Sequence, residues 1–74
     1  MRTFYKNKSG SIFAVRKNAN GAYCAYHRIC RGGKLSTHWL PVRSLTPRWK
    51  ESQAQEDLDR YADKFGIRFY AQVD

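Results

Sequence analysis

The first half of the chain alternates short apolar and aromatic runs with clusters of turn-forming residues. The runs TFYK, SIFAVRK, AYCAYHRIC and LSTHWLPV are separated by NKSGS at 7–11, NANG at 18–21 and RGGK at 31–34. Aromatic and β-branched residues favour strands, and Asn-Gly and Gly-Gly supply the positive φ that tight hairpin turns require. The pattern therefore predicts a meander of antiparallel strands over residues 1–45.

The spacing of apolar residues changes from residue 52 onward. A single stripe of apolar residues follows the three-to-four-residue period of an amphipathic helix. The stripe consists of Ala54, Leu58, Tyr61, Ala62 and Phe65. We predict a helix over residues 52–65, with Trp49 packed beneath its first turn.

The ends of this helix carry their own signals. Ser52 and Gln55 have the spacing of a capping box, and Gly66 follows the stripe as a C-terminal stop. An alternative start places Thr46 at the N-cap and Pro47 at the first helical position, where proline is favoured. The sequence leaves these two starts open.

The residues after the helix, IRFYAQV at 67–73, have the β-branched and aromatic content of a last strand. The predicted fold class is α+β: an antiparallel sheet of three or four strands, one amphipathic helix packed on one face, and a short C-terminal strand at an edge. A chain of 74 residues is long enough for one domain with a thin core. That domain comprises a basic β-meander (1–45), the helix (52–65) and the terminal strand (67–73).

Strand alternation assigns the side chains to two faces, provided that residues 32–33 form a two-residue turn. Tyr26 then lies opposite Trp39, and His27 opposite His38. The face expected to meet the helix gathers Phe13, Val15, Cys24, Tyr26, Cys30, Leu35 and Trp39. The outer face gathers Ile12, Ala14, Arg16, Tyr23, Ala25, His27, Ile29, His38, Leu40 and Val42. Apolar residues in the second set indicate either a binding patch or reversed faces, because any odd-length turn exchanges the two sides.

Charge is divided sharply along the chain, whose net charge is +8. Residues 1–50 hold eleven Lys or Arg and no Asp or Glu, whereas residues 51–74 hold all six acids and three bases. Such a division produces a field that attracts a polyanion to one side of the molecule. A basic, soluble surface without a specific partner is the simpler interpretation of the same charges.

Metal binding and catalysis are disfavoured by the placement of the cysteines and histidines. Cys24, His27, Cys30 and His38 offer ligand types for zinc, but zinc pairs lie two to four residues apart across a turn. On one strand, Cys24 and Cys30 lie roughly 20 Å apart, too far for a disulfide, and His27 points to the other side. No Gly-rich phosphate loop follows a strand. We predict no metal, no cofactor and no enzymatic activity.

Nucleic-acid binding is the function that this pattern favours. Lys and Arg side chains contact phosphates, and aromatic side chains on sheets stack on bases in single-strand and RNA binders. The alternative geometry places a three-stranded sheet in the major groove of DNA. The candidate nucleic-acid-binding residues are Arg16, Tyr23, His27, Arg31, Lys34, His38 and Arg43. Alternatively, the tyrosine and histidines only fill space between strands.

The order of strands followed by a helix resembles the sheet-plus-helix DNA-binding domains of tyrosine integrases. The segment SQAQEDLDRYADKFG, after a strand ending WLPVR, is similar to the tail of short uncharacterised proteins of bacterial phages and integrated mobile elements. This resemblance implies a bacterial origin and no established activity. It also introduces a rival function, a protein-interaction module that does not bind nucleic acid.

The cellular setting follows from what the chain lacks. No apolar run reaches the length of a membrane span or a secretion signal. We expect a cytoplasmic protein whose partner is DNA, RNA or another protein, with no membrane contact and no evident small-molecule substrate.

Overall fold

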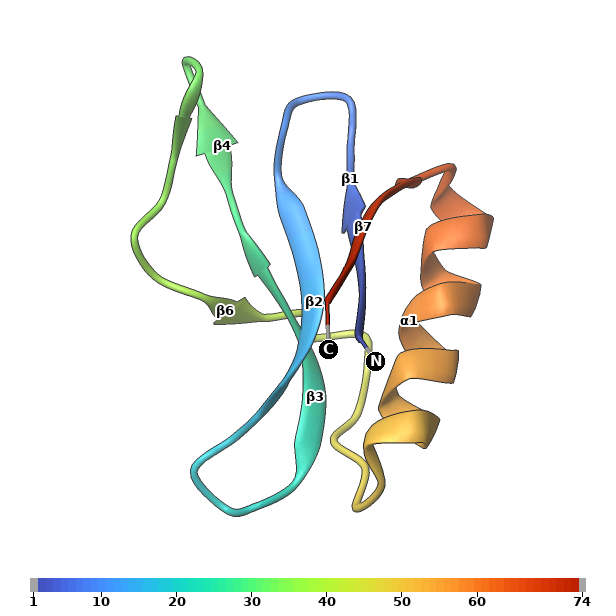
Figure 1. The fold of residues 1–74 in the computed structure, drawn as a ribbon. Coiled ribbons are helices and arrows are strands. Elements are labelled where there is room, and N and C mark those ends of the chain that lie inside the picture. Colours follow the sequence, from blue (N-terminus) through green and yellow to red (C-terminus); the bar gives the residue numbers. More distant parts are fainter. Residues whose placement is uncertain (1, 74) are drawn as a thin grey trace.

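Two antiparallel sheets and one helix make up residues 2–73, the part of the chain that the computed structural model describes (Figure 1). The elements are β1 (Arg2–Lys6), β2 (Ile12–Lys17), β3 (Tyr23–Arg28), β4 (Cys30–Arg31), β5 (Lys34–Leu35), β6 (Leu40–Pro41), α1 (Glu51–Phe65) and β7 (Arg68–Val73). The predicted α+β class is confirmed.

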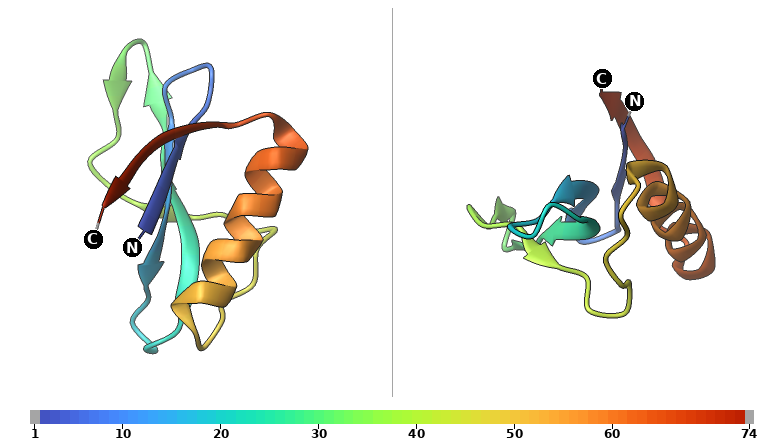
Figure 2. Two further views of the ribbon diagram at one scale, coloured as in Figure 1. Left: turned by 45° about the vertical axis from the view of Figure 1, so that its right-hand side comes forward. Right: turned by 90° about the horizontal axis from the view of Figure 1, so that it is seen from below.

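The main sheet has five strands in the order β6-β3-β2-β1-β7. Strands β4 and β5 form a separate hairpin that extends beyond β3 (Figure 1). Strand β7 returns after the helix and pairs antiparallel with β1, so that Arg2 lies opposite Val73 (Figure 2). The predicted terminal strand at a sheet edge is therefore confirmed. Within residues 2–73, no helix has the length and apolar character that crossing a bilayer requires.

The β1–β2 and β2–β3 hairpins use the same turn. Asn7 accepts hydrogen bonds on Oδ1 from the N–H groups of Ser9 and Ser11, at 3.1 and 2.9 Å. Asn18 repeats the arrangement with residues 20 and 22, at 2.9 and 3.0 Å. The fourth residue of each turn, Gly10 or Gly21, has positive φ, as the three-residue hairpin loop requires. Both loops are thus odd in length.

This odd length corrects the predicted faces. In the β2–β3 ladder, Phe13 pairs with His27 and Val15 with Ala25. The helix covers this side, as the core contacts of Phe13, Val15 and Ala25 demonstrate. Phe13 and Val15 therefore face the helix as predicted. The prediction that Cys24, Tyr26 and Trp39 do so is wrong, because β3 presents its other side to the helix.

The β4–β5 hairpin has the expected two-residue turn, with Arg31 opposite Lys34. That register does not continue to β6. Tyr26 pairs with Pro41 and His27 with Leu40, rather than with Trp39 and His38. The residues between β5 and β6 leave the ladder and shift the register by two positions.

The hydrophobic core lies between α1 and the central strands. It consists of Phe13, Val15, Ala25, Val42, Ala54 and Leu58. Leu58 and Val15 are fully buried, so Leu58 of the predicted stripe meets the sheet as its spacing predicts. Phe65, at the end of the stripe, is 59% exposed and does not. Burial of this apolar surface is the main force holding the two layers together.

Helix α1 begins one residue earlier than expected. Lys50 is the N-cap and makes no side-chain cap bond, so the capping box at Ser52 and the start at Pro47 are both wrong. Gly66 ends the helix in the left-handed conformation, as predicted. Trp49 is 75% exposed instead of lying beneath the helix.

Polar contacts also fasten α1 to β1. The hydroxyl of Tyr5 donates to Asp59 Oδ1 at 2.6 Å. Gln55 Oε1 accepts a hydrogen bond from the Thr3 N–H at 3.1 Å, and Gln55 Nε2 donates one to Asp59 Oδ1 at 3.0 Å. These bonds fix the helix across β1 and leave the opposite side of the sheet uncovered by α1.

Candidate nucleic-acid interface

The outer face of the main sheet is the side opposite α1. Alternate residues of β1, β2, β3 and β7 form it, and one side chain from the β5–β6 connection lies across it. We define this outer face by Phe4, Lys6, Ile12, Ala14, Arg16, Tyr26, Arg28, Arg68 and Trp39.

Trp39 is the organising side chain of the outer face. The guanidinium carbons of Arg16 and Arg28 lie 5.0 and 5.9 Å from the centre of its ring. The ring of Phe4 meets it edge-on at 6.5 Å. Trp39 therefore contacts side chains from three strands, β1, β2 and β3. The indole holds two cations by cation–π attraction.

Arg28 is fixed by a second contact. Its Nε donates a hydrogen bond of 2.6 Å to the carbonyl oxygen of Ser36. This bond and the Trp39 ring restrain the guanidinium, while its terminal nitrogens remain available for a phosphate. Less side-chain freedom is then lost when an anion binds.

A row of cations crosses four strands on the outer face. Lys6 is the Cα partner of both Arg68 and Ile12, and Ile12 is the partner of Arg28. Neighbouring strands are about 4.8 Å apart, so the three cations of this row lie along a line of roughly 15 Å. Arg16 adds a fourth cation further along the sheet.

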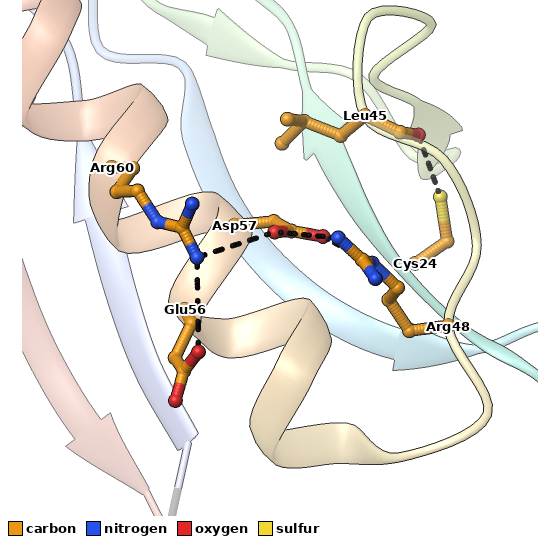
Figure 3. Close-up of polar contacts among 6 residues, drawn as sticks. All are labelled: Cys24, Leu45, Arg48, Glu56, Asp57 and Arg60. Atoms are coloured by element: carbon orange, nitrogen blue, oxygen red, sulfur yellow. Dashed lines mark hydrogen bonds and ion pairs between the residues drawn. The ribbon is translucent and has the colours of Figure 1, made fainter.

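Negative charge lies on the opposite layer. No Asp or Glu occurs in a strand of residues 2–73, and five of the six acids belong to α1. The sixth, Asp74, lies outside the described residues. The ion pairs among residues 2–73 join Arg48 to Asp57 at 2.8 Å, and Arg60 to Glu56 and Asp57 at 3.7 and 3.9 Å (Figure 3). The cations of the outer face are thus separated from the acids by the sheet.

The candidate residues predicted from sequence do not form one surface. Arg16 alone lies on the outer face. Tyr23 and His27 belong to the side that the helix covers, Tyr23 packing against the core and His27 against Phe13 at 5.4 Å between ring centres. Arg43 lines a hollow with His27 near β6.

The remaining three candidates lie beyond the main sheet. Arg31 and Lys34 are exposed at the tip of the β4–β5 hairpin. His38 is exposed in the connection that precedes β6, where its N–H donates to Ser36 Oγ. The hairpin tip therefore extends the basic surface, and it lies at the same end of the sheet as the β1–β2 turn (Figure 1).

His27 does not supply a positive charge at neutral pH. Desolvation by burial lowers the pKa of its imidazole below the usual 6.5, because a low-dielectric surrounding disfavours the charged form. The neutral ring is a packing residue beside Phe13.

The cysteines are free thiols, Cys24 buried and Cys30 half-buried. Burial raises the pKa of the Cys24 thiol, which favours its protonated, unreactive form. Cys24 and His27 point to opposite sides of β3, since their partners are Arg16 and Phe13. Among residues 2–73 no three Cys, His, Asp or Glu side chains lie close enough to hold a metal ion.

Sequence reasoning missed six residues of this surface: Phe4, Lys6, Tyr26, Arg28, Arg68 and Trp39. For Tyr26 and Arg28 the motif Asn-x-x-Gly at 18–21, which repeats that at 7–10, was the available signal, because it specifies a three-residue loop and thereby which side chains of β3 face the helix. No protein-family model matches the chain, and neither a curated protein nor a solved structure matches it.

Proposed function

We propose that this chain is a non-enzymatic nucleic-acid-binding module that uses the outer face of its main sheet. The observation that carries the proposal is the clamp of Arg16 and Arg28 on Trp39, within a surface where residues 2–73 place further cations and no carboxylate. The proposed setting is the cytoplasm of a bacterium that carries a phage or an integrated element.

The chemistry of the outer face suits a phosphate backbone. Lys6, Arg16, Arg28 and Arg68 supply four cations, and Phe4, Tyr26 and Tyr70 supply aromatic rings between them. Single-strand and RNA binders combine charge and rings on a sheet in this way. The β4–β5 hairpin adds two exposed cations beside this face, and a two-stranded ribbon fits the major groove of a duplex.

Binding of labelled oligonucleotides at several salt concentrations tests the proposal. Four phosphate contacts predict a log–log salt slope of about −3 for a single strand and about −4 for a duplex. Arg28→Glu should weaken binding and make the slope shallower by about one or more. Lys50→Glu, the same charge change beside the helix, is the matched control and should weaken binding much less. Absence of binding even at low salt would reject the proposal.

A protein-interaction module is the second candidate, and the open edge of β7 favours it. Phe69 and Tyr70 are 62% and 50% exposed on this edge strand. Unpaired strand edges with apolar side chains are templates for pairing with another chain. Binding of a protein that is unaffected by Arg28→Glu but lost on substitution of Phe69 would support this candidate.

A further inference from the structure

A hollow of about 400 Å³ lies where the β1–β2 turn meets the beginning of β7. It lies at the β7 end of the cation row, the end furthest from the Trp39 clamp, and its lining combines Lys6 and Arg68 of the outer face with Phe69, whose cross-strand partner Tyr5 faces the helix. Its lining consists of Lys6, Asn7, Lys8, Gly66, Arg68, Phe69 and Tyr70. This volume falls within the range of small-ligand sites, and the chemistry of the lining distinguishes this hollow.

The charges around this hollow are all positive. Three of the seven lining residues are Lys or Arg, and none is acidic. Lys6 and Arg68 are cross-strand partners, so their side chains leave neighbouring positions of the sheet, and Lys8 approaches from the turn. Three cations around one space favour a ligand with more than one negative charge.

Two exposed aromatic rings complete the lining. The ammonium of Lys6 lies 5.2 Å from the centre of the Tyr70 ring, which restrains both side chains at the rim. Phe69, the next residue of β7, also lines the hollow, and its side chain is 62% exposed. Exposed rings beside cations are suited to a planar group on which they stack.

One feature opposes an anion here. Gly66 is the C-cap of α1, and the C-terminal end of a helix carries partial negative charge. Its effect is reduced because the Gly66 and Ile67 N–H groups bond to the Asp63 and Ala62 carbonyl oxygens. Three full positive charges outweigh the remaining half charge.

From these contacts we infer that the hollow binds a nucleoside phosphate monoester. A phosphate monoester carries a charge of about −1.5 to −2 at neutral pH, whereas an internal phosphodiester carries a single negative charge. The ligand is either a free mononucleotide or the phosphorylated end of a nucleic-acid strand. In the second case the inference rests on the proposed function, because the strand would continue along the row toward Arg28.

Amide NMR spectra of the intact chain provide the direct test. Titration with adenosine monophosphate should shift the signals of residues 6–8 and 66–70 and leave those near Trp39 unchanged. Lys8→Glu should weaken this binding at least about tenfold, as loss of a charged contact implies. Lys17→Glu is the matched control, because it makes the same charge change at the other end of β2 and Lys17 does not line the hollow.

Oligonucleotides that differ only in a terminal phosphate distinguish the two sources. Tighter binding of the phosphorylated strand, lost in Lys8→Glu, identifies a strand end; binding of the mononucleotide without this preference identifies a free nucleotide. If neither ligand shifts these signals, or if inorganic phosphate competes as well as the nucleotide, the inference is wrong. Oligonucleotide binding that depends on Arg28 but not on Lys8 would leave the proposed function intact, whereas absence of all oligonucleotide binding would reject that function separately.

Discussion

The guanidinium of Arg16 lies 5.0 Å above the ring of Trp39, on the side of the sheet that the helix does not cover. The two residues are far apart in sequence, and the connection between β5 and β6 brings them together. Arg28 shares the same ring at 5.9 Å. A single indole thus determines where two cations of the outer face stand.

Replacing Trp39 with alanine should therefore weaken oligonucleotide binding. We expect a loss of about 1–3 kcal/mol, the range found when an aromatic platform is removed, because both guanidinium groups become mobile. Trp49→Ala is the matched control, since Trp49 is 75% exposed and is not a residue of the outer face. Fluorescence anisotropy measures both, and circular dichroism confirms that each variant is folded. Equal affinities for the two variants would contradict the clamp.

Leu58 should be the most costly leucine to truncate. It is fully buried between α1 and the sheet, and Leu→Ala changes at such sites cost about 2–5 kcal/mol. Leu35 in β5 is 36% exposed, and its truncation should cost less than about 1 kcal/mol. Urea unfolding of both variants measures the difference, and a similar loss for the two would mean that the core lies elsewhere.

The two equivalent turn glycines should respond differently to alanine. Both have positive φ, which an L residue adopts at a cost of about 1–2 kcal/mol. A Cβ at Gly10 would also lie 3.1 Å from the sulfur of Cys30, whereas one at Gly21 meets only Lys17 at 4.0 Å. Gly10→Ala should thus destabilise more than Gly21→Ala in thermal unfolding. Cys30→Ala should recover the additional loss, and failure to do so would exclude this contact as the cause.

Acid should destabilise the fold through His27. Its pKa is lowered by burial in the folded state, so the folded chain binds fewer protons than the unfolded chain below pH 6.5. The contribution of the neutral ring is complete above about pH 6.5 and is lost as pH falls through the lowered pKa. His27→Gln should remove this part of the pH dependence of the unfolding free energy, and the exposed His38→Gln variant should retain it. A profile unchanged in His27→Gln would contradict the assignment.

Alkali should weaken the attachment of α1 to β1. The pKa of Tyr5 is raised from 10.0 to about 12, first by burial and then by its hydrogen bond to Asp59. A raised pKa adds stability that is complete below pH 10 and is lost between about pH 10 and 12. Tyr5→Phe should lack this loss, which the difference between the two unfolding profiles would reveal. Ultraviolet titration should show one tyrosine ionising near pH 12.

The strand, turn and helix positions were predictable because each depends on local chemistry. The apolar stripe through Leu58 has the period of a helix, which few other structures accommodate. The stop at Gly66 depends on a residue type that favours the left-handed conformation at a helix end. The missing cap at Lys50 was not predictable, because Arg48 forms a backbone bridge with Tyr23 and thereby determines where the chain enters the helix.

The candidate site was predicted only in part, because the odd or even length of each turn determines which side chains of the next strand face the helix. One residue more or less in a turn exchanges every side chain of the next strand, so the three-residue loop at 19–21 placed Tyr23 and His27 beneath the helix and Arg28 outside. Trp39 depends on a connection that leaves the ladder altogether. Its position is a tertiary result, and no local pattern encodes it.

The pairing of Arg2 with Val73 has a practical consequence for handling the protein. A tag, dye or surface linker attached at either end of the segment emerges at the same corner of the sheet. The β1–β7 pair runs about 15 Å from that corner to Lys6 and Arg68, at roughly 3.3 Å per residue. Immobilisation through either end therefore leaves the hollow at the far end of these strands open to a ligand in solution.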